Sequence, residues 1–348
     1  MTTSTPSITH VAETLRQLGV QTLAVLREHL DGNRPQSWLT DLVIDYPTRG
    51  GKAVRPALCL ATCRAFGGRL EEALPSAAAI ELLHNAFLVH DDIEDESLVR
   101  RGKPTLHELA GLPLALNAGD AMLIEAMAIL RGNRALLGSR MADRVLREFE
   151  QMLRHTVQGQ AIELGWRRDR VVDLEADDYV ELIMRKTCWY TTIHPLRIGA
   201  LIGGWNRIPL EPLVRFGTYL GAAFQIQDDL LNLLGDEETY GKEILGDLYE
   251  GKYTLMLAHL LKELDRPERS ELLDGFLGMP REQRTETDAR HVLDLMHRHG
   301  SIAFARNFAE GIKTAAIHAF EPAFAAAPPS PDRVFLRDMV DFMLERQL

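Results

Sequence analysis

Apolar residues recur along most of this chain at the spacing of one face of an α-helix. Near the N-terminus the spacing joins Val11, Leu15, Leu18, Leu23, Leu26 and Leu30, and it returns over residues 213–226 and 334–344. Alternating apolar and polar runs, which are typical of β-strands, are nearly absent. Glycine and proline clusters fall between the periodic stretches, for example Pro47 to Gly51 and Pro328 to Pro331. We therefore expect an all-α protein whose helices, about ten or more, are joined by short loops.

The charge balance narrows the classes of partner. The chain has 39 Lys and Arg against 50 Asp and Glu, for a net charge of −11. A protein that binds nucleic acid needs a basic face for the phosphate backbone, and an anionic membrane surface attracts basic segments. We therefore expect neither as a main partner, whereas acidic residues gathered in a pocket would hold metal ions.

The cysteines and the apolar runs favour a soluble protein of a reducing compartment. Three cysteines are too few for a disulfide framework. The most apolar long stretch, Leu112 to Leu130, is broken by Asn117, Asp120 and Glu125, so it falls short of the roughly 20 apolar residues of a membrane span. The first ten residues are polar and resemble no secretory signal. We expect a cytoplasmic protein without stable membrane insertion.

One short acidic pattern occurs twice, each time where an apolar helical stretch ends. The first copy is His90-Asp91-Asp92-Ile93-Glu94-Asp95 and the second is Gln227-Asp228-Asp229-Leu230-Leu231-Asn232. Residues four apart in a helix lie on one face, so Asp91 and Asp95 point the same way. Like charges this close repel each other, and partial burial adds a desolvation cost that a bound cation removes. Solvated helix ends would explain either copy alone; the repetition favours a metal site.

Oxygen donors without a histidine or cysteine in register indicate a hard cation, and Mg²⁺ is typically held by a few carboxylates together with substrate phosphates. Basic residues suited to such phosphates follow or precede the acidic patterns, at Lys52, Arg55, Arg100, Arg101, Lys186, Lys242 and Lys252. Arginine suits phosphate oxygens with paired hydrogen bonds, whereas lysine acts as a point charge. The residues thus predict a site for Mg²⁺ and phosphate groups.

These residues, in this order and spacing, resemble the trans-isoprenyl diphosphate synthases, also called polyprenyl synthetases. The matching blocks are Gly50-Gly51-Lys52-x-x-Arg55-Pro56, Glu81-Leu82-Leu83-His84, Asp91-Asp92-x-x-Asp95, Arg100-Arg101-Gly102, Lys186-Thr187, Phe224-Gln225-x-Gln227-Asp228-Asp229, Gly241-Lys242 and Gly251-Lys252. The motif-bearing core spans about residues 36–261. Agreement at all of these blocks is highly specific.

The resemblance implies a single domain over residues 1–348, a large antiparallel helical bundle around a central cavity. Motifs more than a hundred residues apart along the chain must then build one cavity. The resemblance also implies a homodimer, and three Mg²⁺ ions as cofactor between the two aspartate-rich helix ends.

The resemblance also implies a role for each motif residue. Asp91, Asp95 and Asp228 would be direct metal ligands. Asp92 and Asp229 would act through water molecules or by contacting the residues that bind the metal. Arg100, Lys186, Lys242 and Lys252 would bind the allylic diphosphate, and Lys52, Arg55, His84 and Arg101 would bind isopentenyl diphosphate. Thr187 and Gln225 would lie near the reacting carbons.

The implied reaction joins isopentenyl diphosphate to an allylic diphosphate. Cations stabilise the negative charge that develops as the allylic C–O bond breaks. The double bond of isopentenyl diphosphate, held alongside, attacks the allylic cation, and proton loss leaves a chain five carbons longer. No side-chain nucleophile is required, which agrees with the lack of an evident catalytic Ser, Cys or His arrangement.

Asn232 departs from the family pattern, which usually has a third aspartate there, and so removes a charge from that side. Asparagine at this place is also typical of class I terpene cyclases, which share the helical fold and are the leading alternative. A cyclase holds no second diphosphate, and the basic group of Lys52, Arg55, His84 and Arg101 argues against it. A non-catalytic subunit of a heteromeric synthase is a third alternative, although such subunits tend to lose an aspartate motif.

Product length is expected to depend on Ala86 and Phe87, one turn before the first acidic pattern. In the family this helix forms the wall along which the growing chain lies, and side chains here set the floor of the cavity. One aromatic residue beside a small one favours a C20 product, geranylgeranyl diphosphate, with C15 (farnesyl) and C25 products left open.

Overall fold

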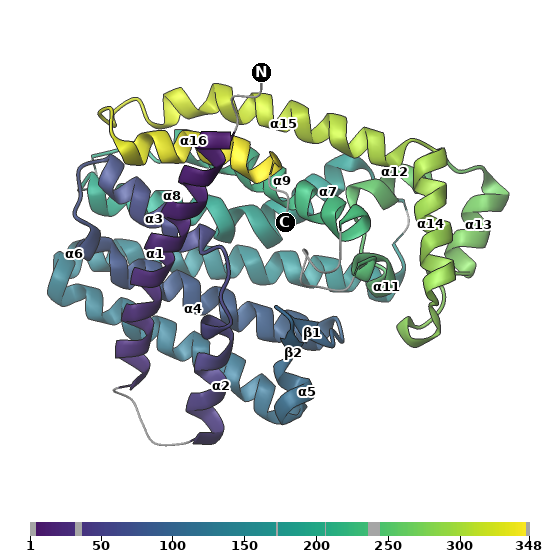
Figure 1. Ribbon diagram of the computed structural model, residues 1–348, viewed down its shortest axis with the longest axis horizontal. Helices are drawn as coiled ribbons and strands as arrows, with labels where there is room; N and C mark the ends of the chain where they lie inside the picture. The colour runs from purple at the N-terminus through teal and green to yellow at the C-terminus, as the bar shows by residue number, and fades with distance from the viewer. Residues whose placement is uncertain (1–4, 32–36, 172, 206, 236–243, 346–348) are drawn as a thin grey trace.

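The computed structural model describes residues 5–31, 37–171, 173–205, 207–235 and 244–345, and most of them are helical (Figure 1). The all-α prediction is therefore confirmed. The elements are α1 (Thr5–Asp31), α2 (Ser37–Thr48), α3 (Val54–Ala65), α4 (Leu70–Glu94), β1 (Val99–Arg100), β2 (Lys103–Pro104), α5 (Leu106–Ala110), α6 (Leu112–Asp169), α7 (Ala176–Ile183), the π-helical η1 (Met184–Ile193), α8 (His194–Gly203), α9 (Glu211–Leu234), α11 (Gly246–Glu250), α12 (Leu255–Glu263), α13 (Arg266–Asp274), the 3₁₀ turn η2 (Arg281–Gln283), α14 (Glu286–Arg298), α15 (Ser301–Ala323) and α16 (Pro331–Glu345).

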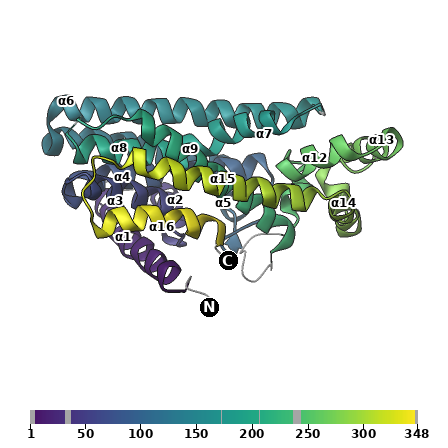
Figure 2. The same ribbon diagram turned by 90° about the horizontal axis from the view of Figure 1, so that it is seen from above.

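Helix α4 lies at the centre of the molecule because its middle is apolar on all sides. Most side chains from Ala73 to Val89 are buried, and a helix that is apolar all round must be covered by its neighbours. Helix α4 packs along α6 and α3, while α9 packs against η1 and α15. Figure 2 shows α6 along one face of the molecule and α1 and α16 along the opposite face.

Helix α6 is a hairpin of two helical arms. Gly138 has a φ of +73° and a non-helical ψ of 159° within it, and Arg134 reaches back across this turn to Asp143 at 2.8 Å. Glycine adopts positive φ without the steric cost that other residues carry. The chain therefore folds back at Gly138.

By length and composition alone, α6 is the one helix in the described part of the chain that is long and apolar enough to cross a membrane. The most apolar window of α6 has a mean hydropathy of 1.4. This differs from the expectation that Asn117, Asp120 and Glu125 would interrupt such a stretch. A third of that window is buried inside the protein, and α6 forms extensive contacts with α4 and η1. These contacts identify it as a core helix.

Glycines let two helices approach η1 closely. A Cβ on Gly159 of α6 would lie 2.2 Å from the backbone nitrogen of Lys186, and one on Gly221 of α9 would lie 2.7 Å from Thr192 Oγ1. Both contacts are far shorter than any carbon contact allows. Because π-helical turns change the direction in which successive side chains point, η1 presents Lys186, Thr187 and Tyr190 to the space between α4 and α9.

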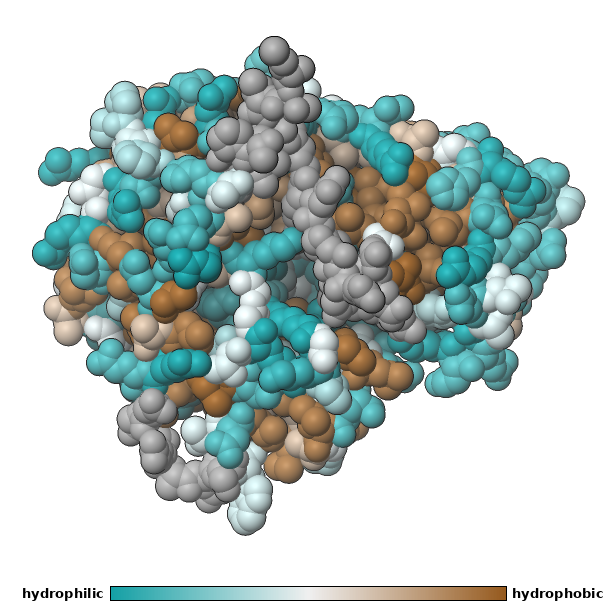
Figure 3. All heavy atoms as spheres, viewed as in Figure 1, coloured by the Kyte–Doolittle hydropathy of each residue, from teal (hydrophilic) through white to brown (hydrophobic). Residues whose placement is uncertain are grey.

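On the face seen in Figure 3, which lies opposite to α6, polar side chains are interspersed with smaller apolar areas, and a larger apolar area lies on the right. A mixed surface of this kind is normal for a folded protein.

Candidate active site

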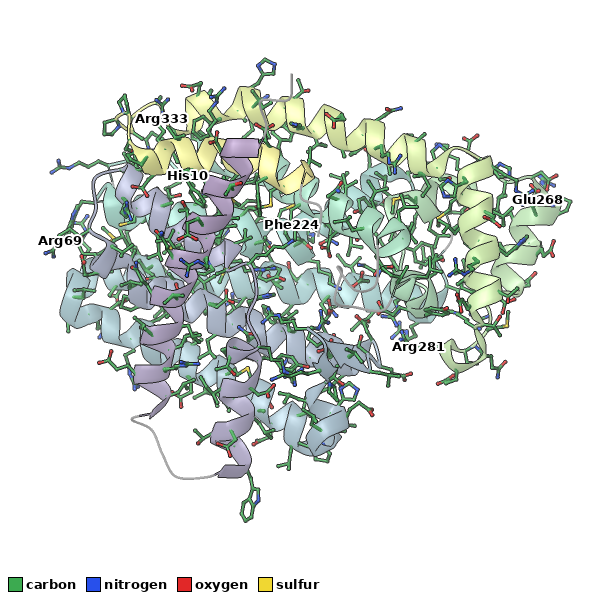
Figure 4. The ribbon with its side chains drawn as sticks, in the orientation of Figure 1. His10, Arg69, Phe224, Glu268, Arg281 and Arg333 are labelled. Carbon is green, nitrogen blue, oxygen red and sulfur yellow. The ribbon has the colours of Figure 1, made fainter. Side chains whose placement is uncertain are left out.

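A cavity of about 650 Å³ lies between α4, α6, η1 and α9, near the centre of the molecule, where Figure 4 labels Phe224. Most of the residues predicted for the site line it: Lys52, Arg55, His84, Phe87, Asp91, Arg100, Arg101, Lys186, Thr187, Gln225, Asp228, Asp229 and Lys252. Ala86, Asp92 and Asp95 are buried outside this lining. Lys242 lies outside the described residues. Motifs from distant parts of the chain therefore meet around one cavity.

The first acidic pattern is the C-terminal turn of α4. Asp91 faces the cavity, where its Oδ1 accepts from Gln160 Nε2 at 3.2 Å and from Lys186 Nζ at 3.3 Å. Asp92 points the other way and is fully buried. Its carboxylate accepts from both Arg100 Nε and Nη2 and from Tyr46 Oη at 2.5 Å. Asp92 therefore fixes Arg100 at the cavity wall.

Asp95 is the C-cap residue of α4, where its backbone N–H donates to the Asp91 carbonyl. Its carboxylate accepts from Arg167 Nη1 at 2.5 Å. Burial and then the Asp91 carboxylate raise its pKa, although Lys186 and Arg167 oppose the shift. The pKa of Glu94 is raised as well, chiefly by burial. The carboxyl groups at this end of α4 thus keep raised pKa values despite their basic neighbours.

The second acidic pattern is the end of α9. Asp229 is 1% exposed and accepts from Tyr179 Oη at 2.7 Å, from Gln225 Nε2 at 2.7 Å and from Lys252 Nζ at 3.4 Å. Gln225 in turn accepts from Thr187 Oγ1 at 2.9 Å. A chain of hydrogen bonds therefore runs from η1 through Gln225 to Asp229, while Asp228 lines the cavity beside it.

Asn232, which departs from the family pattern, is buried and holds a loop. Its side-chain oxygen accepts from the backbone nitrogen of Asp247 at 3.0 Å, and its carbonyl accepts from the nitrogen of Leu245 at 2.8 Å. The amide of Asn232 thus anchors the N-terminal end of α11 to α9.

The predicted diphosphate pocket at the start of α3 is built around Arg55. Its Nη2 donates to Tyr190 Oη at 2.6 Å and to Thr191 Oγ1 at 2.9 Å, and its guanidinium lies over the Tyr190 ring at 4.3 Å. Arg101 donates to the Tyr46 carbonyl at 3.1 Å and lies against Gly51, where a Cβ would approach it to 2.9 Å. Lys52 and His84 line the same part of the cavity. Basic side chains from three segments therefore converge here.

Several cavity residues were not found from the sequence. Glu163 of α6 is 3% exposed and pairs with Lys186, and Gln160 on the same helix contacts both Asp91 and Glu94. Tyr190 packs edge-on against Phe87, with ring centroids 5.9 Å apart. The signal for Glu163 was a carboxylate four residues after Gly159, on an otherwise apolar face. Tyr190 carried no such signal, because its role depends on three other elements.

The carboxylates suit a cation that also binds the ligand. In the described part of the chain, no three His, Cys, Asp or Glu side chains come together as a ready metal cage. Mg²⁺ usually takes one or two protein carboxylates and completes its shell with water and phosphate oxygens. Oxygen donors at Asp91 and Asp228, with raised carboxyl pKa values nearby, fit this mode of binding.

Comparison with known proteins points to one family. The sequence profile of the polyprenyl synthetases matches residues 36–296. The chain is 32% identical to the short chain isoprenyl diphosphate synthase of Methanothermobacter thermautotrophicus, over 86% of this chain and 88% of that protein.

Solved structures of similar proteins agree with that comparison. The geranylgeranyl pyrophosphate synthetase of Pyrococcus horikoshii Ot3 superposes with a TM-score of 0.83 at 30% identity, over 98% of this chain and 99% of that one. A polyprenyl synthase of Caulobacter crescentus CB15, complexed with calcium and isoprenyl diphosphate, superposes with a TM-score of 0.83 at 27% identity, over 97% and 98%. The expected antiparallel bundle around a central cavity is therefore confirmed.

Proposed function

Because this chain belongs to the polyprenyl synthetase family and is a prenyltransferase of the short-chain trans-prenyl diphosphate synthases, we propose that it joins isopentenyl diphosphate to an allylic diphosphate and that its product is geranylgeranyl diphosphate. The observation that carries the proposal is the meeting of two aspartate-bearing helix ends and two basic groups around one cavity. Two separate basic groups would each bind one diphosphate, so the cavity suits two substrates.

The chain's own residues bind and orient the two substrates. Lys186, Lys252 and Arg100 lie beside the aspartates and receive the allylic diphosphate, and Lys242 is proposed to join them. Lys52, Arg55, His84 and Arg101 hold isopentenyl diphosphate on the α3 side. Thr187 and Gln225, whose side chains are hydrogen-bonded at 2.9 Å, present polar oxygens to the carbons that become cationic. Positioning of this kind converts a bimolecular reaction into an effectively unimolecular one.

Asp91, Asp95 and Asp228 would hold three Mg²⁺ ions. Asp92 and Asp229 would support them through water molecules or by contacting the residues that bind the ions. When bound, the ions would neutralise the departing diphosphate. The C. crescentus relative was solved with calcium and isoprenyl diphosphate, which supports a divalent cation in this family.

Phe87 and Tyr190 support the proposed product length. Phe87 lines the cavity, whereas Ala86 is fully buried outside it. The edge-on packing of Tyr190 against Phe87 adds a second ring to this part of the wall. The packed rings of Phe87 and Tyr190 would block the growing chain at this part of the wall, and the relative from P. horikoshii is named as a geranylgeranyl pyrophosphate synthetase.

A homodimer is proposed from the surface of α6. Leu112, Leu116, Ile124 and Leu136 on its first arm are between 42% and 67% exposed. A groove lies between the two arms, lined on its apolar side by Met127, Leu130 and Leu146 among others. Exposed apolar side chains beside an apolar groove are typical of an interaction site, and a second α6 would cover part of them. The protein is a soluble enzyme, and we propose the cytoplasm as its location.

Product analysis tests the proposal. The purified protein is incubated with Mg²⁺, isopentenyl diphosphate and dimethylallyl, geranyl or farnesyl diphosphate, and the products are identified by mass spectrometry. We expect linear prenyl diphosphates that end at C20. Cyclic hydrocarbons formed without isopentenyl diphosphate would instead indicate a terpene cyclase, and turnover only after a second protein is added would indicate a regulatory subunit.

Phe87→Ala tests the chain-length assignment. Removing the ring opens the cavity wall beside Tyr190, so the products should become longer by one or more five-carbon units. The matched control is Phe304→Ala on α15. It also removes one phenyl ring, but from a contact with His259. An unchanged product distribution in Phe87→Ala would reject the assignment.

A further inference from the structure

The loop between α9 and α12 carries three charged side chains, and one of them, Lys252, lines the cavity. Asp247, Glu250 and Lys252 all lie within or directly after α11, a helix of little more than one turn. Residues with positive φ stand on both sides of this helix, Leu245 at +64° and Gly251 at +69°. A helix this short is not stable by itself. Contacts from outside the loop must therefore hold it.

Arg284 provides two of those contacts, in addition to the two hydrogen bonds that Asn232 accepts. It lies between η2 and α14, in a segment without any of the sequence motifs. Its Nη1 donates to the carbonyls of Leu248 at 3.2 Å and Tyr249 at 2.6 Å, both in α11. On the other side its Nε and Nη2 donate to the carbonyls of Phe276 at 3.0 Å and Leu277 at 3.2 Å. One guanidinium thus joins α11 to the C-terminal end of α13.

The guanidinium lies directly against the residue that precedes Lys252. A Cβ on Gly251 would approach Arg284 Nη1 to 2.8 Å, so the absence of a side chain there admits the guanidinium. Lys252 is oriented from the same loop: its backbone nitrogen donates to the Asp247 carbonyl at 2.9 Å, and its Nζ lies 3.3 Å from Asp247 Oδ1 and 3.4 Å from Asp229 Oδ1. The position of the ammonium therefore depends on the shape of this loop.

We propose that Arg284 is a positioning residue for the prenyltransfer reaction: by fixing α11 and Gly251 it places the Lys252 ammonium beside Asp229 to receive the allylic diphosphate. The proposal rests on the proposed function, in which Lys252 binds that diphosphate. The segment from α13 to α14 would then take part in catalysis by positioning Lys252, in addition to packing against the rest of the protein.

A purely structural Arg284 is the competing explanation, since the same hydrogen bonds attach α13 and α14 to the rest of the protein. The two explanations differ in which kinetic constant changes. A positioning role acts through Lys252 and so affects the allylic substrate, whereas a general loss of folding would lower the active fraction and leave both KM values in place. A double-mutant cycle with Lys252 separates them.

The experiment compares Arg284→Gln, Lys252→Ala and the double variant with the unmodified protein. KM is measured for geranyl diphosphate and for isopentenyl diphosphate, and the melting temperature is recorded for each. In Arg284→Gln we expect the KM for geranyl diphosphate to rise about tenfold, as for one weakened charge-assisted hydrogen bond. The KM for isopentenyl diphosphate should change by less than about twofold. In the Lys252→Ala background the same substitution should add less than about twofold.

Arg333→Gln is the matched control. Arg284 lies 5.3 Å from the centre of the Phe276 ring. Arg333 likewise lies 5.8 Å from the centre of the Phe320 ring, and it donates to the Glu321 carboxylate. Figure 4 labels it at the opposite end of the molecule from Arg281, which is three residues before Arg284. Both of its KM values should stay unchanged. Arg284→Lys keeps the charge but loses most of the hydrogen-bond donors. If Arg284→Gln does not fold, the KM values of Arg284→Lys are compared in the same way.

Equal effects of Arg284→Gln on both substrates, or an undiminished effect in the Lys252→Ala background, would overturn the positioning role. Failure of the proposed function would be distinguishable, because the unmodified protein would then give no prenyl product. In that case, the affinity of each variant for inorganic diphosphate with Mg²⁺ is measured by calorimetry. These affinities complete the same double-mutant cycle without any turnover.

Discussion

The Glu148 cluster, which consists of Glu148 with Arg197 and His194, and the carboxylates at the cavity differ in how their charges are balanced. Arg197 donates to both oxygens of Glu148, at 2.8 and 2.7 Å, and His194 Nδ1 lies 2.9 Å from Oε2. Burial raises the pKa of Glu148, but the hydrogen bonds from Arg197 and His194 outweigh it and lower the pKa to about 2. This carboxylate is fully compensated inside the protein.

At the cavity the balance is reversed. Burial, and then the carboxylates of Asp95 and Asp247, raise the pKa of Glu250, and burial likewise raises the pKa of Glu81. Burial lowers the pKa of Lys186, but the carboxylates of Asp91 and Glu163 more than reverse this. The buried carboxylates near the cavity therefore keep raised pKa values that its basic residues do not reverse. Clustered carboxylates with raised pKa values are typical of functional sites, and a single compensated carboxylate is typical of structure.

The largest effect that follows from this contrast is the loss of activity in Asp91→Ala. Without this carboxylate the charge that would hold Mg²⁺ at the end of α4 is lost, and with it several kcal/mol of stabilisation of the leaving diphosphate. Turnover should fall by about a thousandfold or more. The measurement is the rate of incorporation of isopentenyl diphosphate at saturating Mg²⁺.

Glu148→Gln is the control for that experiment, because it changes one partly buried carboxylate on α6 that lies in the other cluster. We expect nearly normal kcat and a normal Mg²⁺ requirement in this variant. If Glu148→Gln lost activity as completely as Asp91→Ala while remaining folded, the division between a functional and a structural cluster would be wrong.

The second effect is the stability of the same variant. Glu148→Gln leaves Arg197 without its carboxylate partner, so the free energy of unfolding at pH 7 should fall by about 2 kcal/mol. Urea denaturation followed by circular dichroism measures it. In contrast, Asp91→Ala removes a repelling charge and should leave the free energy of unfolding unchanged or slightly higher.

The pH dependence sharpens this prediction. The pKa of Glu148 is lower in the folded protein, about 2, than in the unfolded chain, about 4.3. Its stabilising contribution is therefore present in full above the unfolded pKa and is lost as the pH falls towards the folded one. The difference in unfolding free energy between the unmodified protein and Glu148→Gln should thus shrink between about pH 5 and pH 2. A constant difference over this range would contradict the charge-based explanation.

Much of the fold was predictable because helix periodicity is a local property. The spacing of Leu213, Phe216 and Leu220 was sufficient to place a helix that the structure extends from Glu211 to Leu234. The fold-back of α6 at Gly138 and the π-helical turn of η1 were not predicted. Both depend on how neighbouring helices pack, since Gly138 lies within an otherwise helical sequence and Gly159 matters only because Lys186 lies against it.

The site was predictable where a motif lies in one short segment. Asp91, Lys186 and Gln225 were located in this way, and all three line the cavity. Arg284 and Tyr190 were missed because each acts through contacts with elements far away in the sequence. Their types and neighbours in the chain carry no signal, so only the packed structure reveals them.

The smallest effect concerns Asn232. It lies at the edge of the carboxylates at the cavity, yet it resembles the Glu148 cluster because its side-chain oxygen already has a hydrogen-bond donor. Its side-chain oxygen accepts from the backbone nitrogen of Asp247. A carboxylate oxygen accepts the same hydrogen bond, so Asn232→Asp should preserve α11 and change the Mg²⁺ concentration for half-maximal activity by less than about threefold. Asn232→Leu, which is similar in size but has no acceptor, should raise the KM for the allylic substrate because the loop that carries Lys252 loses its anchor. A tenfold gain in Mg²⁺ affinity in Asn232→Asp would instead place position 232 among the metal ligands and move it into the functional cluster.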